Sequence, residues 1–184
     1  MMKRLMGCFV GMVGLALAVF SNVALAAPTE CDGLLSGHVA GGVVVNDGDT
    51  CFLGGATVSG GVQVNGGGQL VACASTINGG LVANDAVAVI VGAEEVLGCS
   101  GNLINGGVHV SNARLGALPE QGPPAVAVEN SVIKGGVFLT DNLGWIAVVG
   151  NTIAGGLFCS NNAFDLVDEN SPSKVTGKTT CKFE

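Results

Sequence analysis

The chain has 184 residues, of which 31 are Gly, 48% are hydrophobic and 11% are charged, with a formal net charge of −7 at pH 7. An acidic surface repels phosphate backbones, so this balance excludes nucleic acid as a partner. Low charge combined with abundant Val, Leu and Ile excludes a disordered chain, which needs the opposite composition.

The first 26 residues read as an export signal. Lys3 and Arg4 precede the apolar stretch 5–20, and Ala24-Leu25-Ala26 follows it as a cleavage site. This arrangement predicts a Sec signal peptide over residues 1–26. The apolar stretch is shorter than the roughly 20 residues of a usual membrane span, and we expect no span elsewhere. The mature chain, residues 27–184, is expected to form one domain in the periplasm or outside a bacterial cell.

A short motif recurs along the mature chain with the pattern apolar, any residue, Gly, Gly, apolar, any residue, apolar, polar. The second Gly of each pair stands at Gly42, Gly61, Gly80, Gly107, Gly136 and Gly156, with spacings of 19, 19, 27, 29 and 20 residues. Alternation with period two predicts a strand with one buried face. The Gly pair before it predicts a corner that turns at positive φ.

A second apolar run follows each Gly pair after about ten residues, and no segment has helical periodicity. A coil of about 20 residues made of strands and corners indicates a parallel β-helix. We therefore predict an all-β, right-handed parallel β-helix of about six to seven coils. The two longer periods predict extruded loops within 92–102, which carries Glu94 and Glu95, and 113–124, which carries Pro119. Insertions in repeat proteins gather on one face, often the binding face.

Two polar columns are expected beside the alternating strands, because like positions stack in a solenoid. One column contains Asn46, Asn65, Asn84, Ser111, Thr140 and Ser160, and the next contains Asp47, Gly66, Asp85, Asn112, Asp141 and Asn161. Asn and Asp side chains satisfy backbone groups at turns, so we interpret both columns as structural. A calcium site is the alternative, but the three acids do not lie on adjacent coils and lack the spacing of calcium-binding β-rolls.

The mature chain has six Cys, an even number that indicates disulfides in an exported protein. Six Cys allow 15 pairings, and the repeat narrows them because residues one coil apart are stacked at about 4.8 Å. We predict Cys31–Cys51, Cys73–Cys99 and Cys159–Cys181. The first and third bonds would fasten the two ends of the rod. No metal site and no cofactor are expected, since no C-x-x-C occurs and the two His are far apart.

Four residues are candidates for binding. His109, Phe138 and Phe158 occupy outward positions of their strands, and Trp145 is near Phe138 in the sequence. Together they predict an apolar patch on the last coils, which could stack on a sugar or contact a partner. An exposed residue on a sheet face is the plainer interpretation of His109.

The sequence shows no catalytic constellation, so we expect a protein that is not an enzyme. Polysaccharide lyases and glycosidases with a β-helix fold need clustered carboxylates, and lyases also need a base. Arg114 is the only Arg of the mature chain, and Lys134 has no aligned acid. A carbohydrate-active enzyme of the pectate-lyase type is the alternative. Ice binding is disfavoured because Leu103 and Val132 interrupt the column of Thr57, Thr76 and Thr152.

The Gly-Gly-Val/Leu repeat, with its closing Gly-Leu-Phe-Cys-Ser-Asn at 156–161 and the terminal Gly177 and Cys181, resembles small exported bacterial β-solenoid proteins of uncharacterised function. It resembles more loosely the bactofilins, which are polymer-forming β-helices. The resemblance implies a structural or adhesive protein of the cell envelope or extracellular space. Its partner would be a polysaccharide, a cell surface, a protein or a second copy of the chain.

Overall fold

The computed structural model describes residues 26–93, 98–99, 101–115 and 122–184. The predicted signal peptide therefore lies outside the described residues, apart from Ala26. So do Glu94 and Glu95 of the first predicted loop and Pro119 of the second. The described chain is all-β and all its strand pairs are parallel. This confirms the predicted fold class.

The first face of the solenoid, face A, is a seven-stranded sheet built from the alternating strands of the repeat. Neighbours along the sheet are one period apart in the sequence, so Val62, Leu81 and Val108 stand side by side. The strands in spatial order are β1 (Thr29–Glu30), β3 (Val43–Val45), β5 (Val62–Val64), β8 (Leu81–Asn84), β11 (Val108–Ser111), β14 (Val137–Thr140) and β17 (Leu157–Ser160).

The other two faces form one 12-stranded sheet that bends at β4 (Thr50–Val58). The first half of β4 pairs with β6, and its second half pairs with β7. Face B contains β6 (Gln69–Cys73), β9 (Ala88–Val91), β12 (Val126–Glu129), β15 (Ile146–Val149) and β18 (Leu166–Val167). Face C contains β7 (Thr76–Ile77), β10 (Leu103–Ile104), β13 (Val132–Ile133), β16 (Thr152–Ile153) and β19 (Lys174–Val175). At the N-terminal end β2 (Gly33–Val39) pairs with both halves of β4.

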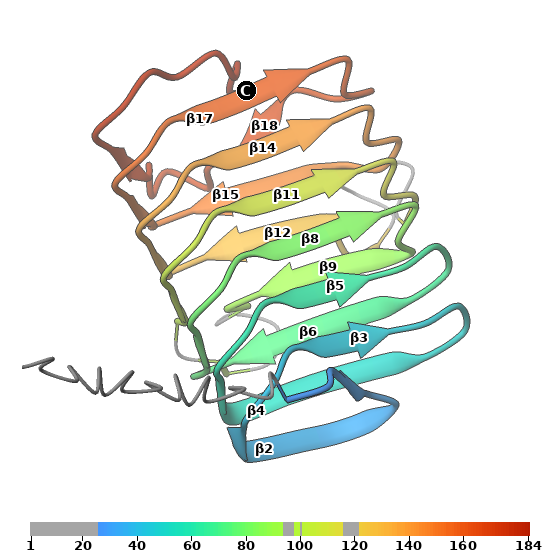
Figure 1. The fold of residues 1–184 in the computed structure, drawn as a ribbon. Helices are drawn as coiled ribbons and strands as arrows, with labels where there is room; N and C mark the ends of the chain where they lie inside the picture. The colour runs from blue at the N-terminus through green and yellow to red at the C-terminus, as the bar shows by residue number, and fades with distance from the viewer. Residues whose placement is uncertain (1–25, 94–97, 100, 116–121) are drawn as a thin grey trace, which may run out of the picture.

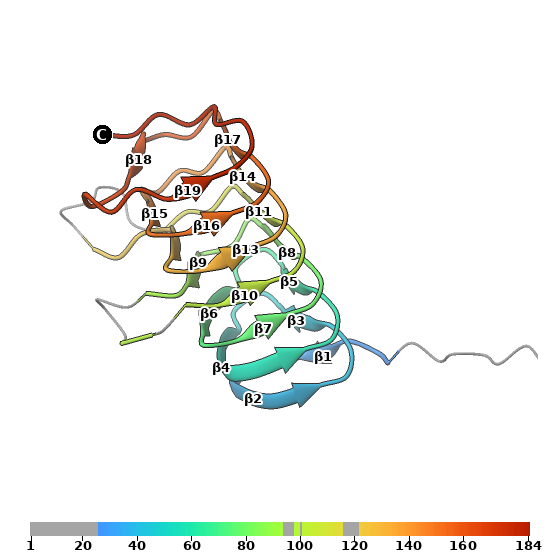
Figure 2. The ribbon, with the colours of Figure 1, turned by 90° about the vertical axis from the view of Figure 1, so that its left-hand side faces the viewer.

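The chain winds as a right-handed coil of triangular cross-section. In Figure 1 the strands of face A lie in front and run left to right while the chain climbs from its N-terminus, and the strands of face B return behind them. Figure 2 shows the same sense of winding from the side of face C. The seven strands of face A correspond to seven coils, as the repeat predicts.

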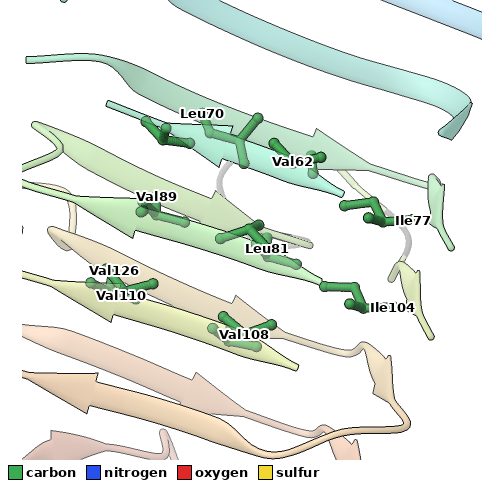
Figure 3. Packing of buried hydrophobic residues seen from close by; sticks show 14 of the residues in the cluster. Val62, Leu70, Ile77, Leu81, Val89, Ile104, Val108, Val110 and Val126 are labelled. Carbon is green, nitrogen blue, oxygen red and sulfur yellow. The ribbon is translucent and has the colours of Figure 1, made fainter. Parts of the chain in front are cut away.

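The core lies along the axis and receives one or two apolar side chains from each face in every coil. Ile77, Ile104, Ile133 and Ile153 form the column from face C, and each is 0% exposed. Figure 3 shows Leu70, Val89 and Val126 of face B pointing toward the same interior as Val62, Leu81 and Val108 of face A. Stacking of like side chains over like ones explains why the repeat preserves residue size as well as polarity.

The Gly pairs serve a different purpose from the one predicted. None of them has positive φ; the described Gly with positive φ lie at other positions, such as Gly55, Gly67 and Gly150. The pairs are required because the backbones of successive corners nearly touch. A Cβ on Gly106 would lie 2.6 Å from the nitrogen of Gly80. The prediction of a positive-φ corner was wrong, and close backbone approach is the physical reason for Gly here.

One set of positive-φ turns belongs to the second predicted polar column. Asp85, Asn112, Asp141 and Asn161 all have φ between 54° and 56°. Asn and Asp enter this left-handed region more easily than other residues. In the first column, Asn65 donates to Asn46 at 3.1 Å and Ser111 donates to Asn84 at 2.9 Å. These bonds agree with the structural interpretation of both columns.

A third polar ladder, inside the core, was not predicted. It runs along the corner between faces B and C, one residue before each strand of face C, and contains Ser75, Asn102, Ser131, Asn151 and Ser173. The side-chain oxygen of each residue from Asn102 onward accepts from the backbone nitrogen of its predecessor at 2.9–3.1 Å. Asn151 also donates to the carbonyl of Val128 at 2.6 Å. The ladder satisfies backbone groups that the corner removes from water.

The structure contains the three predicted disulfides, Cys31–Cys51, Cys73–Cys99 and Cys159–Cys181, with Cα–Cα distances of 5.4, 5.0 and 4.8 Å. The first ties the segment between β1 and β2 to β4, and the third ties the C-terminal segment to β17. The second fastens the first insertion to β6. Three disulfides indicate an oxidising, extracytoplasmic compartment.

Candidate functional site

The two insertions flank face B from opposite sides. The first connects β9 to β10 and so leaves the edge that face B shares with face C. The second connects β11 to β12 and enters face B from face A. Ala93 of the first and Leu115 of the second line the same cavity. The sequence-based expectation that insertions gather on one face therefore holds for their described residues.

An unbroken apolar column runs along the outside of face B. The strand registers place the residues of the column directly over one another, in the order Leu34, Phe52, Val71, Ile90, Ala127, Ala147 and Val167. An outward column on a solvent-exposed sheet is normally polar. Seven apolar residues in succession along the outside of face B depart from this pattern.

The two ends of this column differ in what covers them. At the C-terminal end Ala127 and Ala147 are 0% and 1% exposed, because Trp145 and Phe164 pack over them in a second apolar cluster. At the N-terminal end Leu34 is 76% exposed and Phe52 is 42% exposed. Small side chains stand where the face is covered, and large side chains stand where it is bare.

A cavity of about 580 Å³ lies over the middle of the column. Its floor includes Phe52, Val71, Ile90 and Ala127, and Trp145 and Glu169 line it toward the C-terminal end. Leu115 and the segment Gly122–Pro124 also line it. Binding sites for small molecules typically have volumes of about 300–1,000 Å³ and predominantly apolar walls, and this cavity meets both conditions.

The polar side chains of the cavity are few. Gln69 lies on the same strand as Val71, Glu129 lies on the same strand as Ala127, and Glu169 lies at the C-terminal end of the cavity. Among the described lining residues, these two carboxylates are the charged groups. Polysaccharide lysis would also need a base such as Arg or Lys close to the acids, and the described lining offers neither.

Trp145 is placed apart from the other three candidate binding residues. It precedes β15 on face B, is 9% exposed, and its indole nitrogen donates to the carbonyl of Gly122 at 3.1 Å. The indole is thus fixed against the described end of the second insertion. Trp145 does not share a patch with Phe138 and Phe158, since those residues lie on face A.

His109, Phe138 and Phe158 come together as a stacked ladder on the outside of face A. The ring centroids of His109 and Phe138 are 4.2 Å apart, and those of Phe138 and Phe158 are 4.9 Å apart, with interplanar angles of 26° and 17°. Phe138 therefore uses both faces of its ring for its neighbours. A ladder of this kind offers mainly ring edges to a ligand, which suits stabilisation of adjacent coils better than sugar stacking.

The remaining polar clusters are small. Arg114 and Asp85 form an exposed ion pair at 2.6 Å on the corner between faces A and B. A second cavity of about 190 Å³ lies near the C-terminal end, beside Asn162, Asp165 and Lys182. Across the residues that the structure describes, no three His, Cys, Asp or Glu gather closely enough to hold a metal ion. Nor does this part of the chain contain a helix of the length and hydropathy needed to cross a membrane.

No family model matches the chain, and comparisons with curated proteins and with solved structures found no match either.

Sequence reasoning identified Trp145 and both insertions but missed the cavity floor. The signal for the floor was present in the second apolar run of each coil. The triplets 52–54, 71–73, 90–92, 127–129 and 147–149 begin with an apolar residue that the repeat places on the outside. A strand that is apolar on both faces predicts a sheet that is covered on both sides. The strands of face A alternate with period two and lack this signal.

Proposed function

We propose that the protein is an exported, non-enzymatic β-solenoid of the cell envelope or extracellular space that acts by binding, and that the cavity on face B is its binding site. The observation that carries the proposal is the apolar cavity of about 580 Å³ between the two insertions. The solenoid provides a rigid floor, and the Trp145 indole is held in place by its bond to Gly122.

Several features support a structural or adhesive protein over an enzyme. The described lining carries Glu129 and Glu169 without a cationic base, and Glu169 lies at the far end of the cavity. Cys73–Cys99 fastens one insertion to the floor strand β6, which favours a preformed site. Export through the predicted signal peptide agrees with the oxidising compartment that the three disulfides indicate.

The proposal is tested with the processed chain, residues 27–184, carrying its three disulfides. The protein is incubated with cell-envelope fractions, which are then sedimented to measure bound protein. It is also incubated with a panel of polysaccharides, which are then analysed for new chain ends. We expect retention on an envelope fraction, with no new unsaturated or reducing ends in any polysaccharide. Turnover of a polysaccharide would replace this proposal with the lyase alternative, and failure to bind any fraction would contradict it.

A further inference from the structure

The two ends of the solenoid, at the bottom and the top of Figure 1, carry opposite charges. Glu30 and Asp32 lie on the first coil at the N-terminal end. Lys178 and Lys182 lie on the last turn of the chain at the C-terminal end. All four side chains are exposed and, among the described residues, none of them forms an ion pair. Each end therefore presents charge that the molecule itself leaves unpaired.

The acids near the C-terminal end do not neutralise these lysines. Asp165 lines the same small cavity as Lys182, but no ion pair joins the two among the described residues. Asp168 and Glu169 follow β18 and lie at the corner between faces B and C, whereas Lys182 lies at the corner between faces A and B. The basic charge is therefore concentrated along the edge of face A and its corner with face B.

The main-chain groups at the two edges of face A are also complementary. At the N-terminal edge the N–H groups of Thr29 and Cys31 donate to carbonyls of the next coil at 2.8 and 2.9 Å. Main-chain groups alternate in direction along a strand, so the N–H and C=O of Glu30 point away from the solenoid. At the C-terminal edge Thr180 donates to β17 at 2.9 Å, so the main-chain groups of the residues on either side of it point away.

The strand register shows how a second copy would fit. Thr179 pairs with Leu157 and so belongs to the column of face A that begins with Thr29. Phe183 belongs in the same way to the column of face B that begins with Gly33. At both ends the two columns are four residues apart in the sequence. Residues 29–34 of one copy can therefore stack over residues 179–184 of another, one step of about 4.8 Å away.

This stacking brings complementary groups together. Asp32 falls over Lys182, and the N–H of Glu30 faces a carbonyl of the other copy, as in any parallel pair. Phe183, which is 38% exposed, falls over Gly33, where an added Cβ would meet nothing within 4 Å. The absence of a side chain at this Gly leaves room for the phenyl ring.

Disulfides fasten both of the edges that would meet. Cys31–Cys51 ties the N-terminal edge to β4, and Cys159–Cys181 ties the C-terminal edge to β17. Edges that are fixed in advance lose less conformational entropy when a partner docks on them. The two ends are thus preorganised for contact.

We propose that the protein associates head to tail with further copies of itself, the C-terminal end of one solenoid docking on the N-terminal end of the next. Contact between two like ends would oppose acids to acids or lysines to lysines, which repel. A head-to-tail contact repeated along the axis does not close, so the copies form an open linear chain. On face C the described chain places no strand between β19 and β2 of the next copy, which confines the pairing to faces A and B. The inference is independent of the cavity on face B.

Sedimentation velocity of the processed chain, residues 27–184 with its three disulfides, tests this association. At low ionic strength we expect the weight-average mass to rise continuously with protein concentration and to exceed that of a dimer. Raising the salt to about 0.5 M should shift the protein toward the monomer, because exposed charges are then screened. A mass that stays at the monomer, or that levels off at the dimer, would overturn the proposal.

Matched variants separate the junction from the general charge of the protein. Lys182→Glu opposes like charges at the junction, whereas Lys134→Glu makes the same change at an exposed position beside β13, in the middle of the solenoid. We expect Lys182→Glu to raise the dissociation constant by about tenfold and Lys134→Glu to change it by less than about twofold. Equal effects in the two variants would contradict the proposed junction. Thermal unfolding shows whether each variant is folded.

A double variant tests the polarity of the contact. Asp32→Lys combined with Lys182→Glu exchanges the two charges, so each head-to-tail junction again joins opposite charges. It should return the dissociation constant to within about threefold of its original value. A folded double variant that associates no better than Lys182→Glu alone would show that these two residues do not meet. Asp32 also accepts from the N–H of Thr50 at 3.3 Å, so if the double variant does not fold, the comparison of Lys182→Glu with Lys134→Glu decides the proposal.

Discussion

Faces A and B both carry an outward column of stacked side chains, which is apolar throughout on face B and is interrupted by Gln63 and His109 on face A, and the two columns pack differently. On face A the rings of Phe138 and Phe158 stack on one another and stay half-buried. On face B, Trp145 and Phe164 cover Ala127 and Ala147 and leave a cavity over the neighbouring coils. The register of the solenoid thus determines which side chains stack in a column. The residues that pack over the column determine whether it is covered or left open as a cavity.

The largest effect is expected from a change that disturbs the register of both faces at once. In Gly106→Ala the new Cβ would lie 2.6 Å from the nitrogen and 2.7 Å from the Cα of Gly80. These are backbone atoms, so the coils must separate, and we expect a loss of about 4 kcal/mol in the free energy of unfolding. Urea unfolding followed by circular dichroism measures it.

Gly66→Ala is the control for this prediction. Its Cβ would meet the Cβ of Asp85 at 3.5 Å, which is ordinary contact, and the change should stay within about 1 kcal/mol. Equal losses in the two variants would show that the Gly pairs are not selected by contact between successive corners.

The next largest loss of stability is expected from the interior polar ladder at the corner between faces B and C. Asn151→Ala leaves the backbone nitrogen of Ser131 and the carbonyl of Val128 without these bonds. We expect a loss of about 2–3 kcal/mol because buried polar groups would then be unpaired. Asn78→Ala, which removes an exposed acceptor of Asn105, should change stability by no more than about 0.5 kcal/mol. A small effect in Asn151→Ala would mean that water reaches this corner.

The covered end of face B predicts intolerance of larger side chains. Ala147→Leu adds volume under Trp145 and Phe164 at a position that is 1% exposed, and should cost about 1–3 kcal/mol. Ala154→Leu, at an exposed position after β16 on face C, should be close to neutral. Thermal unfolding of the two variants side by side decides whether the cover is closely packed.

The smallest effect concerns the ladder on face A. A double-mutant cycle with Phe138→Leu and Phe158→Leu should give a coupling energy of about 1 kcal/mol from ring stacking. The neighbouring pair Gln63 and Val82, in the same column, serves as the reference and should couple by less than about 0.5 kcal/mol. Equal coupling energies in both pairs would show that the rings contribute to stability only through the apolar area that they bury.

Much of the fold could be predicted because a solenoid repeats one local rule. The Gly spacing gave the coil length, and stacking of equivalent positions gave all three disulfides. Corner chemistry was predicted less well, since Gly is used both for positive φ and for close approach, and only three-dimensional contacts separate the two. The interior ladder of Asn102 and Asn151 was missed because a polar residue before a strand looks like an exposed turn.

The candidate site was harder to predict for a related reason. Trp145 and Phe138 are close in sequence but belong to different faces, because a coil of about 20 residues turns a short separation into a change of side. The floor of the cavity depends on residues such as Phe52 and Ile90 that are far apart in the sequence. The strand register aligns them in one column, with Val71 between them. Local patterns identify each of them as apolar and do not show that they share an outer column.

The most direct test is a crystal structure of the processed protein. The account predicts an apolar cavity on face B over Val71 and Ile90, with the indole nitrogen of Trp145 bonded to the carbonyl of Gly122. A face B on which the chain itself covers Val71 and Ile90, with no cavity over them, would contradict it.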